Sequence, residues 1–69
     1  MELGQRINTS LGEVIILDIK RNYLILFRTD VNQFIKANGY NYNTNTNNLS
    51  WGGGEYYQNF TDLVAGLEG

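Results

Sequence analysis

Residues 13–29 read EVIILDIKRNYLILFRT, and this stretch decides the fold. Its first seven residues are a β-branched run of strand length, and four consecutive apolar residues in the run indicate cover on both faces. The polar segment Lys20-Arg21-Asn22 follows, and asparagine tolerates the left-handed conformation that a tight hairpin needs. The stretch therefore predicts an antiparallel hairpin, with residues 23–29 as its returning strand.

The residues that follow the hairpin extend the strand pattern. After a polar corner at residues 30–32, residues 33–40 alternate with a period of two, which places Ile35 and Ala37 on the face opposite Phe34 and Lys36. This alternation predicts the third strand of a meander. Residues 41–48 are rich in asparagine, whose side chain competes with the strand ladder for backbone groups, and we expect an exposed loop there.

Strand-type residues return at residues 49–57, on both sides of a run of three glycines at residues 52–54. Such a run is compatible with one strand that carries a glycine bulge, or with two short pieces joined by a turn. These two arrangements give different strand registers around the glycines. On the N-terminal side of the hairpin, residues 3–7 form a short, half-apolar stretch, and residues 8–10 favour a turn before the first strand of the hairpin.

The period changes near residue 59, where a short helix is predicted. Phe60, Leu63, Val64 and Leu67 fall at i, i+3, i+4 and i+7, which is one stripe of a helix. Asn59 or Thr61 can cap its N-terminus. Because the helix is short, its stability has to come from docking this stripe, and we expect the stripe to lie on the residue 13–29 hairpin.

The composition sets limits on organisation and partners. The 69 residues have room for one domain, residues 1–69, and for no second module. The chain has no cysteine and no histidine, so disulfides and the common zinc sites are closed to it, and packing or a homodimer is left to supply stability. The net charge of −2 disfavours binding to nucleic acid or to anionic membranes. Residues 1–10 do not resemble a signal peptide and no apolar run could span a bilayer, so we expect a cytoplasmic protein.

Catalysis is disfavoured by the same composition. General acid–base chemistry at neutral pH is most often done by histidine, and both histidine and cysteine are missing. Carboxylates could still act as a pair, but Asp18, Asp30, Glu55 and Asp62 show no recognisable spacing. The glycine run lacks the lysine of a phosphate loop, and the asparagine-rich stretch lacks the carboxylates of a calcium loop. We therefore expect no catalytic, cofactor-binding or metal-binding residues.

Five aromatic side chains within residues 40–57 are the candidate interaction surface: Tyr40, Tyr42, Trp51, Tyr56 and Tyr57. Tyrosine and tryptophan dominate the energetics of protein interfaces and also stack on nucleic-acid bases. In a strand, the adjacent Tyr56 and Tyr57 point to opposite faces, so one of them can join the core while the other faces solvent or a partner. The alternative interpretation is structural: Trp51 and one of the two tyrosines belong to the core, with their polar tips at its rim.

The C-terminal half carries a resemblance. Residues 34–40, FIKANGY, are followed by a polar loop and by the pattern W-x-x-G-x-Y-Y-x-x-F-x-D-L at residues 51–63. This arrangement resembles small uncharacterised proteins of Gram-positive bacteria and their phages, which combine a β-meander with a short helix. The resemblance implies a small sheet-plus-helix fold and an accessory or anti-defence role on phage or other mobile DNA, in the cytoplasm of the host cell. It transfers no site residue.

Together these patterns predict an α+β domain. It is either an open antiparallel β-meander or a small five-stranded barrel of the Src-homology type, with one short C-terminal helix. The leading functional hypothesis is a non-enzymatic module that binds another protein through the aromatic surface. The alternative is a single-stranded nucleic-acid binder that stacks bases on the same aromatic residues, helped by the basic side chains Lys20, Arg21, Arg28 and Lys36.

Overall fold

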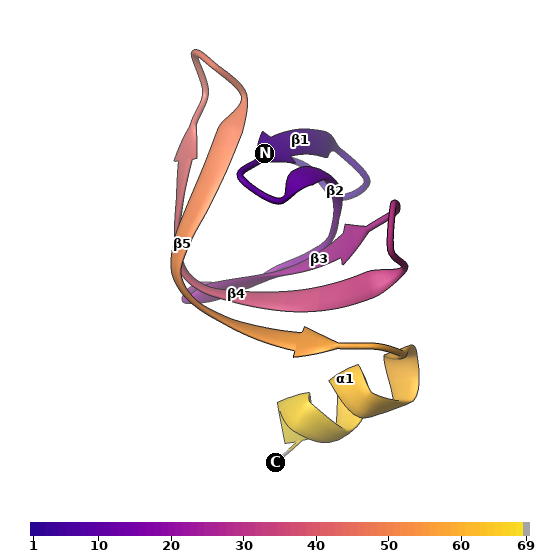
Figure 1. The fold of residues 1–69 in the computed structure, drawn as a ribbon. Helices are drawn as coiled ribbons and strands as arrows, with labels where there is room; N and C mark the ends of the chain where they lie inside the picture. The colour runs from indigo at the N-terminus through magenta and orange to yellow at the C-terminus, as the bar shows by residue number, and fades with distance from the viewer. Residues whose placement is uncertain (69) are drawn as a thin grey trace.

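The computed structural model describes residues 1–68 and contains five strands and one C-terminal helix (Figure 1). The elements are β1 (Arg6–Thr9), β2 (Gly12–Ile19), β3 (Tyr23–Arg28), β4 (Gln33–Asn43), β5 (Asn48–Tyr57) and α1 (Phe60–Glu68). The strands follow the order of the sequence around a closed barrel, in which β5 meets β1. The fold is therefore the small five-stranded barrel with one short C-terminal helix, and not the open meander.

The predicted hairpin is confirmed as β2 and β3. Val14 and Ile16 of β2 are fully buried, as are Leu24 and Leu26 of β3. The expected cover on both faces of β2 is only partly present, because the register shifts between Ile16 and Asp18 and leaves the intervening leucine 41% exposed. A β-bulge of this kind turns one extra residue out of the ladder and strengthens the local twist, which helps a short sheet to curve into a barrel.

The exposed loop expected at residues 41–48 is shorter than predicted. β4 continues to Asn43 and β5 begins at Asn48, and these two residues pair directly, so the connection is only residues 44–47. The physical reason lies in the residues between the asparagines: Tyr42 pairs with Leu49 and both pack against the barrel core. Burial of that inner face outweighs the turn preference of the asparagines, which remain on the outer side of the ladder.

The glycine run lies inside one continuous strand, which settles the choice left open by the sequence. β5 keeps one register with β4, from Phe34 opposite Tyr57 to Asn43 opposite Asn48. The inner face nevertheless changes along β4: Ile35 and Ala37 are buried, and beyond Gly39 the side chain of Tyr40 packs on the core. Gly39 has φ of 64°, a left-handed conformation that a glycine adopts without strain. At this residue the alternation of inward and outward side chains shifts by one position. The β4–β5 hairpin as a whole bends around the barrel (Figure 1).

The helix does not lie on the predicted hairpin. α1 packs against β4 and β5, on the outer side of the barrel (Figure 1). The inner face of the hairpin is already filled by the barrel core, whereas outward-facing aromatic rings offer α1 a docking surface. Phe34 lies between two other rings, with centroids 5.0 Å from Phe27 and 6.0 Å from Phe60. Leu63 is buried, and the two-residue connection after β5 keeps the helix beside that strand.

Of the two predicted capping residues, Asn59 forms the N-cap of α1. Its side-chain Oδ1 accepts a hydrogen bond of 2.8 Å from the backbone N–H of Asp62. The carboxylate of Asp62 lies in the first turn, where the helix dipole favours negative charge. The start of α1 is therefore fixed by local chemistry that can be identified in the sequence.

Candidate functional site

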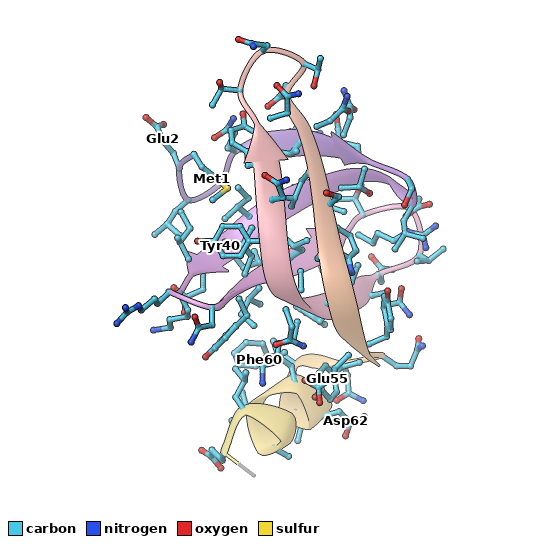
Figure 2. The ribbon with its side chains drawn as sticks, turned by 90° about the vertical axis from the view of Figure 1, so that its left-hand side faces the viewer. Met1, Glu2, Tyr40, Glu55, Phe60 and Asp62 are labelled. Carbon is cyan, nitrogen blue, oxygen red and sulfur yellow. The ribbon has the colours of Figure 1, made fainter. Side chains whose placement is uncertain are left out.

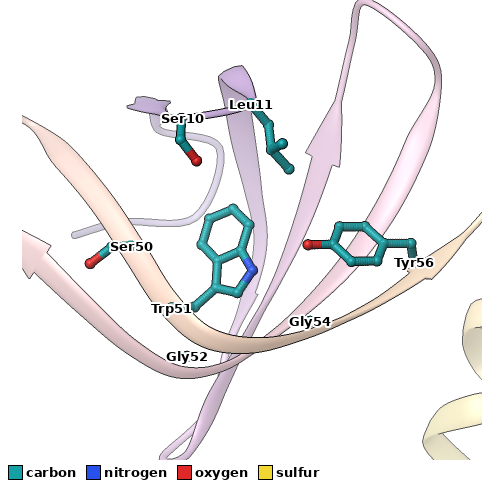
Figure 3. A pocket seen from close by; sticks show the side chains of 7 residues that line it. All are labelled: Ser10, Leu11, Ser50, Trp51, Gly52, Gly54 and Tyr56. Atoms are coloured by element: carbon teal, nitrogen blue, oxygen red, sulfur yellow. The ribbon is translucent and has the colours of Figure 1, made fainter.

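The barrel closes at a narrow point, and a pocket opens beside it. β1 and β5 run parallel and pair only through Asn8 and Asn48, with the N–H of Asn8 donating to the carbonyl of Asn47 at 3.3 Å. Past this contact the turn between β1 and β2 stands on one side and β5 on the other. Between them lies a pocket of about 270 Å³ (Figure 3). Its lining residues are Ser10, Leu11, Ser50, Trp51, Gly52, Gly54 and Tyr56.

Trp51 and Tyr56 form the aromatic part of this pocket. Trp51 is half-buried and packs against the barrel core, whereas Tyr56 is 48% exposed. Trp51 points towards the turn that carries Ser10 and Leu11, and Tyr56 points across the pocket towards Trp51 (Figure 3). Their polar tips converge above Gly54, because a Cβ atom built on this glycine would lie 2.8 Å from the Tyr56 hydroxyl and 2.9 Å from Trp51 Nε1. The glycine therefore leaves the space in which the two rings meet.

Tyr42 has a structural role. Its hydroxyl donates a 2.6 Å hydrogen bond to Oδ1 of Asn47 and accepts one of 3.1 Å from Nε2 of Gln5. The Asn47 amide in turn donates to the carbonyl of Arg6 at 3.3 Å. These bonds connect the tip of the β4–β5 hairpin to the start of β1, next to the point where the barrel closes.

Tyr40 and Tyr57 are also occupied by the fold. Tyr40 packs on the core and donates its hydroxyl to the carbonyl of Lys20 at 3.2 Å. Tyr57 lies on the outer face, half-buried, with its ring directly over Gly66 of α1. The expectation that Tyr56 and Tyr57 face opposite sides is confirmed. The five predicted aromatic residues thus divide, and the structure brings together only Trp51 and Tyr56 as a site.

The other half of the pocket was not identified from the sequence. Ser10 and Leu11 belong to the β1–β2 turn, far from residues 40–57 in the chain. The available signal is a leucine inside an otherwise polar turn, since an apolar residue at such a position usually has a contact to make. Leu11 makes that contact by packing against the core from outside the strands.

Most charges of the barrel are held in pairs on its surface. Four of the five basic residues lie within 4 Å of a carboxylate, in the pairs Arg6–Glu13, Lys20–Asp18, Arg28–Asp30 and Lys36–Glu55. Lys36 also lies over the ring of Tyr23, 4.9 Å from its centroid. Three of the four carboxylates considered for catalysis are therefore each bonded to a cation, and not directed at one another.

The closest ion pair joins Arg28 and Asp30 through two hydrogen bonds, of 2.8 and 3.0 Å. The hydrogen bond from the guanidinium lowers the pKa of Asp30 below its ordinary value, and the same bond raises the pKa of Arg28. Both groups are in contact with water, so this pair fixes the corner between β3 and β4 without creating a reactive group.

A second hollow, of about 570 Å³, lies at the opposite turn of the barrel. It is formed by the β2–β3 turn with Arg21 and Asn22, and by Asn38, Gly39 and Tyr40 of β4. Arg21 is the one basic residue without an ion pair among residues 1–68. The one aromatic residue that lines the hollow, Tyr40, already donates its hydroxyl to the carbonyl of Lys20, so it offers no free aromatic group of the kind that Tyr56 provides.

Within the described part of the chain, no three side chains of the metal-binding types His, Cys, Asp and Glu gather in one place. None of the helical residues described forms a segment long and apolar enough to cross a bilayer. No protein-family model, curated protein or solved structure matches this chain. The pocket at the barrel mouth is therefore the feature from which a function can be inferred.

Proposed function

We propose that this chain is a non-enzymatic protein-interaction module, and that it binds its partner at the pocket between β5 and the β1–β2 turn. One observation carries the proposal: exposed Tyr56 and half-buried Trp51 converge over a glycine at the mouth of the barrel. Tryptophan and tyrosine at the rim of a pocket are the side chains that most often dominate binding energy at protein interfaces. Their rings give contact area at a small cost in conformational entropy.

The size and chemistry of the pocket favour a protein partner. Small-molecule sites have volumes of roughly 300–1,000 Å³ and enclose most of the ligand. The pocket here, at about 270 Å³, is open and has room for a single side chain. No charged side chain lines it, so a neutral apolar or aromatic residue is the complementary anchor.

Nucleic-acid binding receives less support. Three of the four basic residues considered for it, Lys20, Arg28 and Lys36, are paired with carboxylates. A strand of phosphates would have to compete with those carboxylates for each cation. A fluorescent single-stranded oligonucleotide titrated at low salt tests this alternative, and binding that falls steeply with added salt would support it.

The proposal extends to biology through the resemblance of the C-terminal half to small phage and Gram-positive bacterial proteins. We propose an accessory or anti-defence role in the host cytoplasm, since capture of one host protein is sufficient for such a role and requires no catalysis. Plating efficiency of a phage on defended bacteria that express the chain measures this activity. Restored plating with the parent chain, but not with Tyr56→Ala, is the expected result.

Binding itself is tested with a displayed library of linear ten-residue peptides selected on the full chain. Trp51 is the only tryptophan, so its emission reports directly on occupancy of the pocket. Selected peptides should share one large apolar residue, and Tyr56→Ala should weaken them by about tenfold or more. Phe60→Ala is the matched control, because Phe60 is an exposed aromatic residue that lies on α1 and does not line the pocket (Figure 2). Equal binding to the parent and Tyr56→Ala, with both folded, would contradict the proposal.

A further inference from the structure

β5 has a second side that the barrel does not use. It pairs with β4 from Asn48 to Tyr57, but it meets β1 only through Asn48. In an antiparallel ladder, alternate residues turn their N–H and C=O groups away from the neighbouring strand. Among residues 1–68, no backbone hydrogen bond joins residues 50–57 to any segment other than β4. The outer edge of this segment therefore carries main-chain groups with no partner among the described residues.

The residues that expose this edge are the ones that form the pocket. Near Asn48 the parallel contact turns the main chain of Leu49, whose side chain is buried, towards β1. In a strand, the side-chain face and the hydrogen-bonding side alternate together, so the inward-facing residues of β5 all present their main chain to the side away from β4. Trp51 and Tyr56 lie on that inner face, opposite Tyr40 and Ile35. Unpaired main-chain groups and pocket side chains thus come from the same two residues.

The edge is also unprotected. Proteins usually shield such edges with proline, with charges or with a covering segment. The chain has no proline, and the single charged residue of β5, Glu55, is engaged by Lys36 across the ladder at 3.4 Å. At Gly52 and Gly53 a Cβ atom would meet nothing within 4 Å, so open space surrounds the middle of the strand.

We infer that the partner binds as an extended segment that adds a strand to the free edge of β5 and places one apolar side chain in the Trp51–Tyr56 pocket. This inference rests on the proposed function and specifies the form of the partner. In strand addition, main-chain hydrogen bonds supply affinity, and a pocket for a side chain supplies specificity. The free segment, residues 50–57, can pair with about eight residues, or roughly 26 Å of extended chain.

A second copy of the chain is a poorer occupant. If two copies paired through β5, each strand would bring inward-facing side chains that already pack inside its own barrel, including Leu49 and Trp51. The inward-facing side chains of β5 in either copy would then not be free to insert into the pocket of the other. A segment of a different protein, extended and apolar at one position, satisfies both the edge and the pocket.

The experiment uses an eight-residue peptide taken from the library selection and a series of its variants, each methylated at one backbone nitrogen. Paired main chain predicts a period of two: methylation at alternate positions should weaken binding by about tenfold or more, because each methyl group removes a donor that faces β5. Methylation at the positions between should change the affinity by less than about twofold. Hydrogen exchange then identifies the edge, and the amides of Trp51 and Tyr56 should become at least about tenfold slower to exchange when the peptide is bound.

The outcomes separate this inference from the proposed function. Loss of binding in Tyr56→Ala without a period of two, and without protection of the Trp51 and Tyr56 amides, would keep the interaction site and overturn the strand pairing. A selection that yields no peptide dependent on Tyr56 would remove the proposed function as well. Sedimentation of the free chain as a dimer with these amides already protected would show that a second copy occupies the edge, and would also overturn the inference.

Discussion

Replacing Gly54 with alanine should separate binding from stability. The added Cβ would lie 2.8 Å from the Tyr56 hydroxyl, 3.0 Å from Tyr56 Cζ and 2.9 Å from Trp51 Nε1, so both rings have to move. Tyr56 is the more mobile partner because its side chain is 48% exposed, whereas Trp51 packs on the core. The variant therefore places a methyl group in the pocket and displaces the tip of its aromatic wall.

The magnitudes favour a limited change in stability and a large change in affinity. Alanine is better than glycine in a strand by roughly 0.5–1 kcal/mol, which offsets part of the cost of about 1–3 kcal/mol for shifting the exposed phenol and the edge of the indole. The free energy of unfolding should fall by no more than about 2 kcal/mol relative to the parent. A buried apolar anchor contributes about 1.5–3 kcal/mol, so its exclusion should weaken a selected peptide by roughly tenfold to a hundredfold.

The assay pairs urea unfolding with peptide titration, both followed by Trp51 emission. Gly53→Ala is the matched control, since it makes the same chemical change in the same strand, meets nothing within 4 Å and does not line the pocket. It should bind peptide like the parent. If Gly54→Ala bound peptide as tightly as Gly53→Ala does, the pocket would not be the site. If Gly54→Ala unfolded the domain, the reasoning about Tyr56 would be wrong.

Three further predictions concern the helix and the β3–β4 corner. Gly66→Ala should destabilise the domain by about 1–3 kcal/mol in thermal unfolding, because the added Cβ would lie 2.6 Å from Cζ of Tyr57. Alanine itself favours a helix, so a gain in stability would show that the Tyr57 ring moves aside freely. Asn59→Ala should cost about 1 kcal/mol in urea unfolding and Asn59→Ser much less, and equal losses would show that the cap bond is unimportant. The hydrogen bond from Arg28 lowers the pKa of Asp30, so the ionised carboxylate stabilises the fold above the ordinary aspartate pKa, and this stabilisation is lost as the pH falls through the lower folded pKa. Asp30→Asn should therefore lose less stability than the parent between about pH 5 and pH 2 in urea unfolding. Equal losses in the two proteins over this pH range would contradict the prediction.

The parts of the fold that could be predicted depend on contacts close in sequence. The hairpin of β2 and β3 follows from a β-branched run, a short polar turn and a second apolar run, all within residues 13–29. The helix start follows from Asn59 and the i, i+3, i+4 pattern after it. The docking surface of that helix could not be predicted, because the aromatic rings of Phe27, Phe34 and Phe60 come together only after β3 and β4 have paired.

The extension of β4 and β5 through the asparagine-rich segment was missed for a related reason. Taken separately, the asparagines favour a loop, and the two inward residues among them, Tyr42 and Leu49, lie seven positions apart. Their direct pairing becomes visible only when the hairpin closes between Asn43 and Asn48. The change of face at Gly39 is hidden in the same way, since a simple alternation from Ile35 places Tyr40 outside. A positive φ at one glycine reverses the assignment of the residues that follow it.

The sequence predicted the region that holds the candidate site, but not which of its aromatic residues form the site. The hydrogen bonds of the tyrosine hydroxyls distinguish the residues that hold the barrel together from the one that lines the pocket. Tyr40 and Tyr42 give their hydroxyls to groups of the barrel, at the carbonyl of Lys20 and the amide of Asn47. In the described chain the Tyr56 hydroxyl has no such partner, and its ring is the most exposed of the tyrosine rings. A tyrosine that the fold needs is normally satisfied by the fold, whereas one kept beside an open edge with its hydroxyl free retains its bonding capacity for another molecule. The sequence places these tyrosines in one group, and the backbone path through Gly39 and Gly54 decides which of them closes the barrel and which lines the pocket.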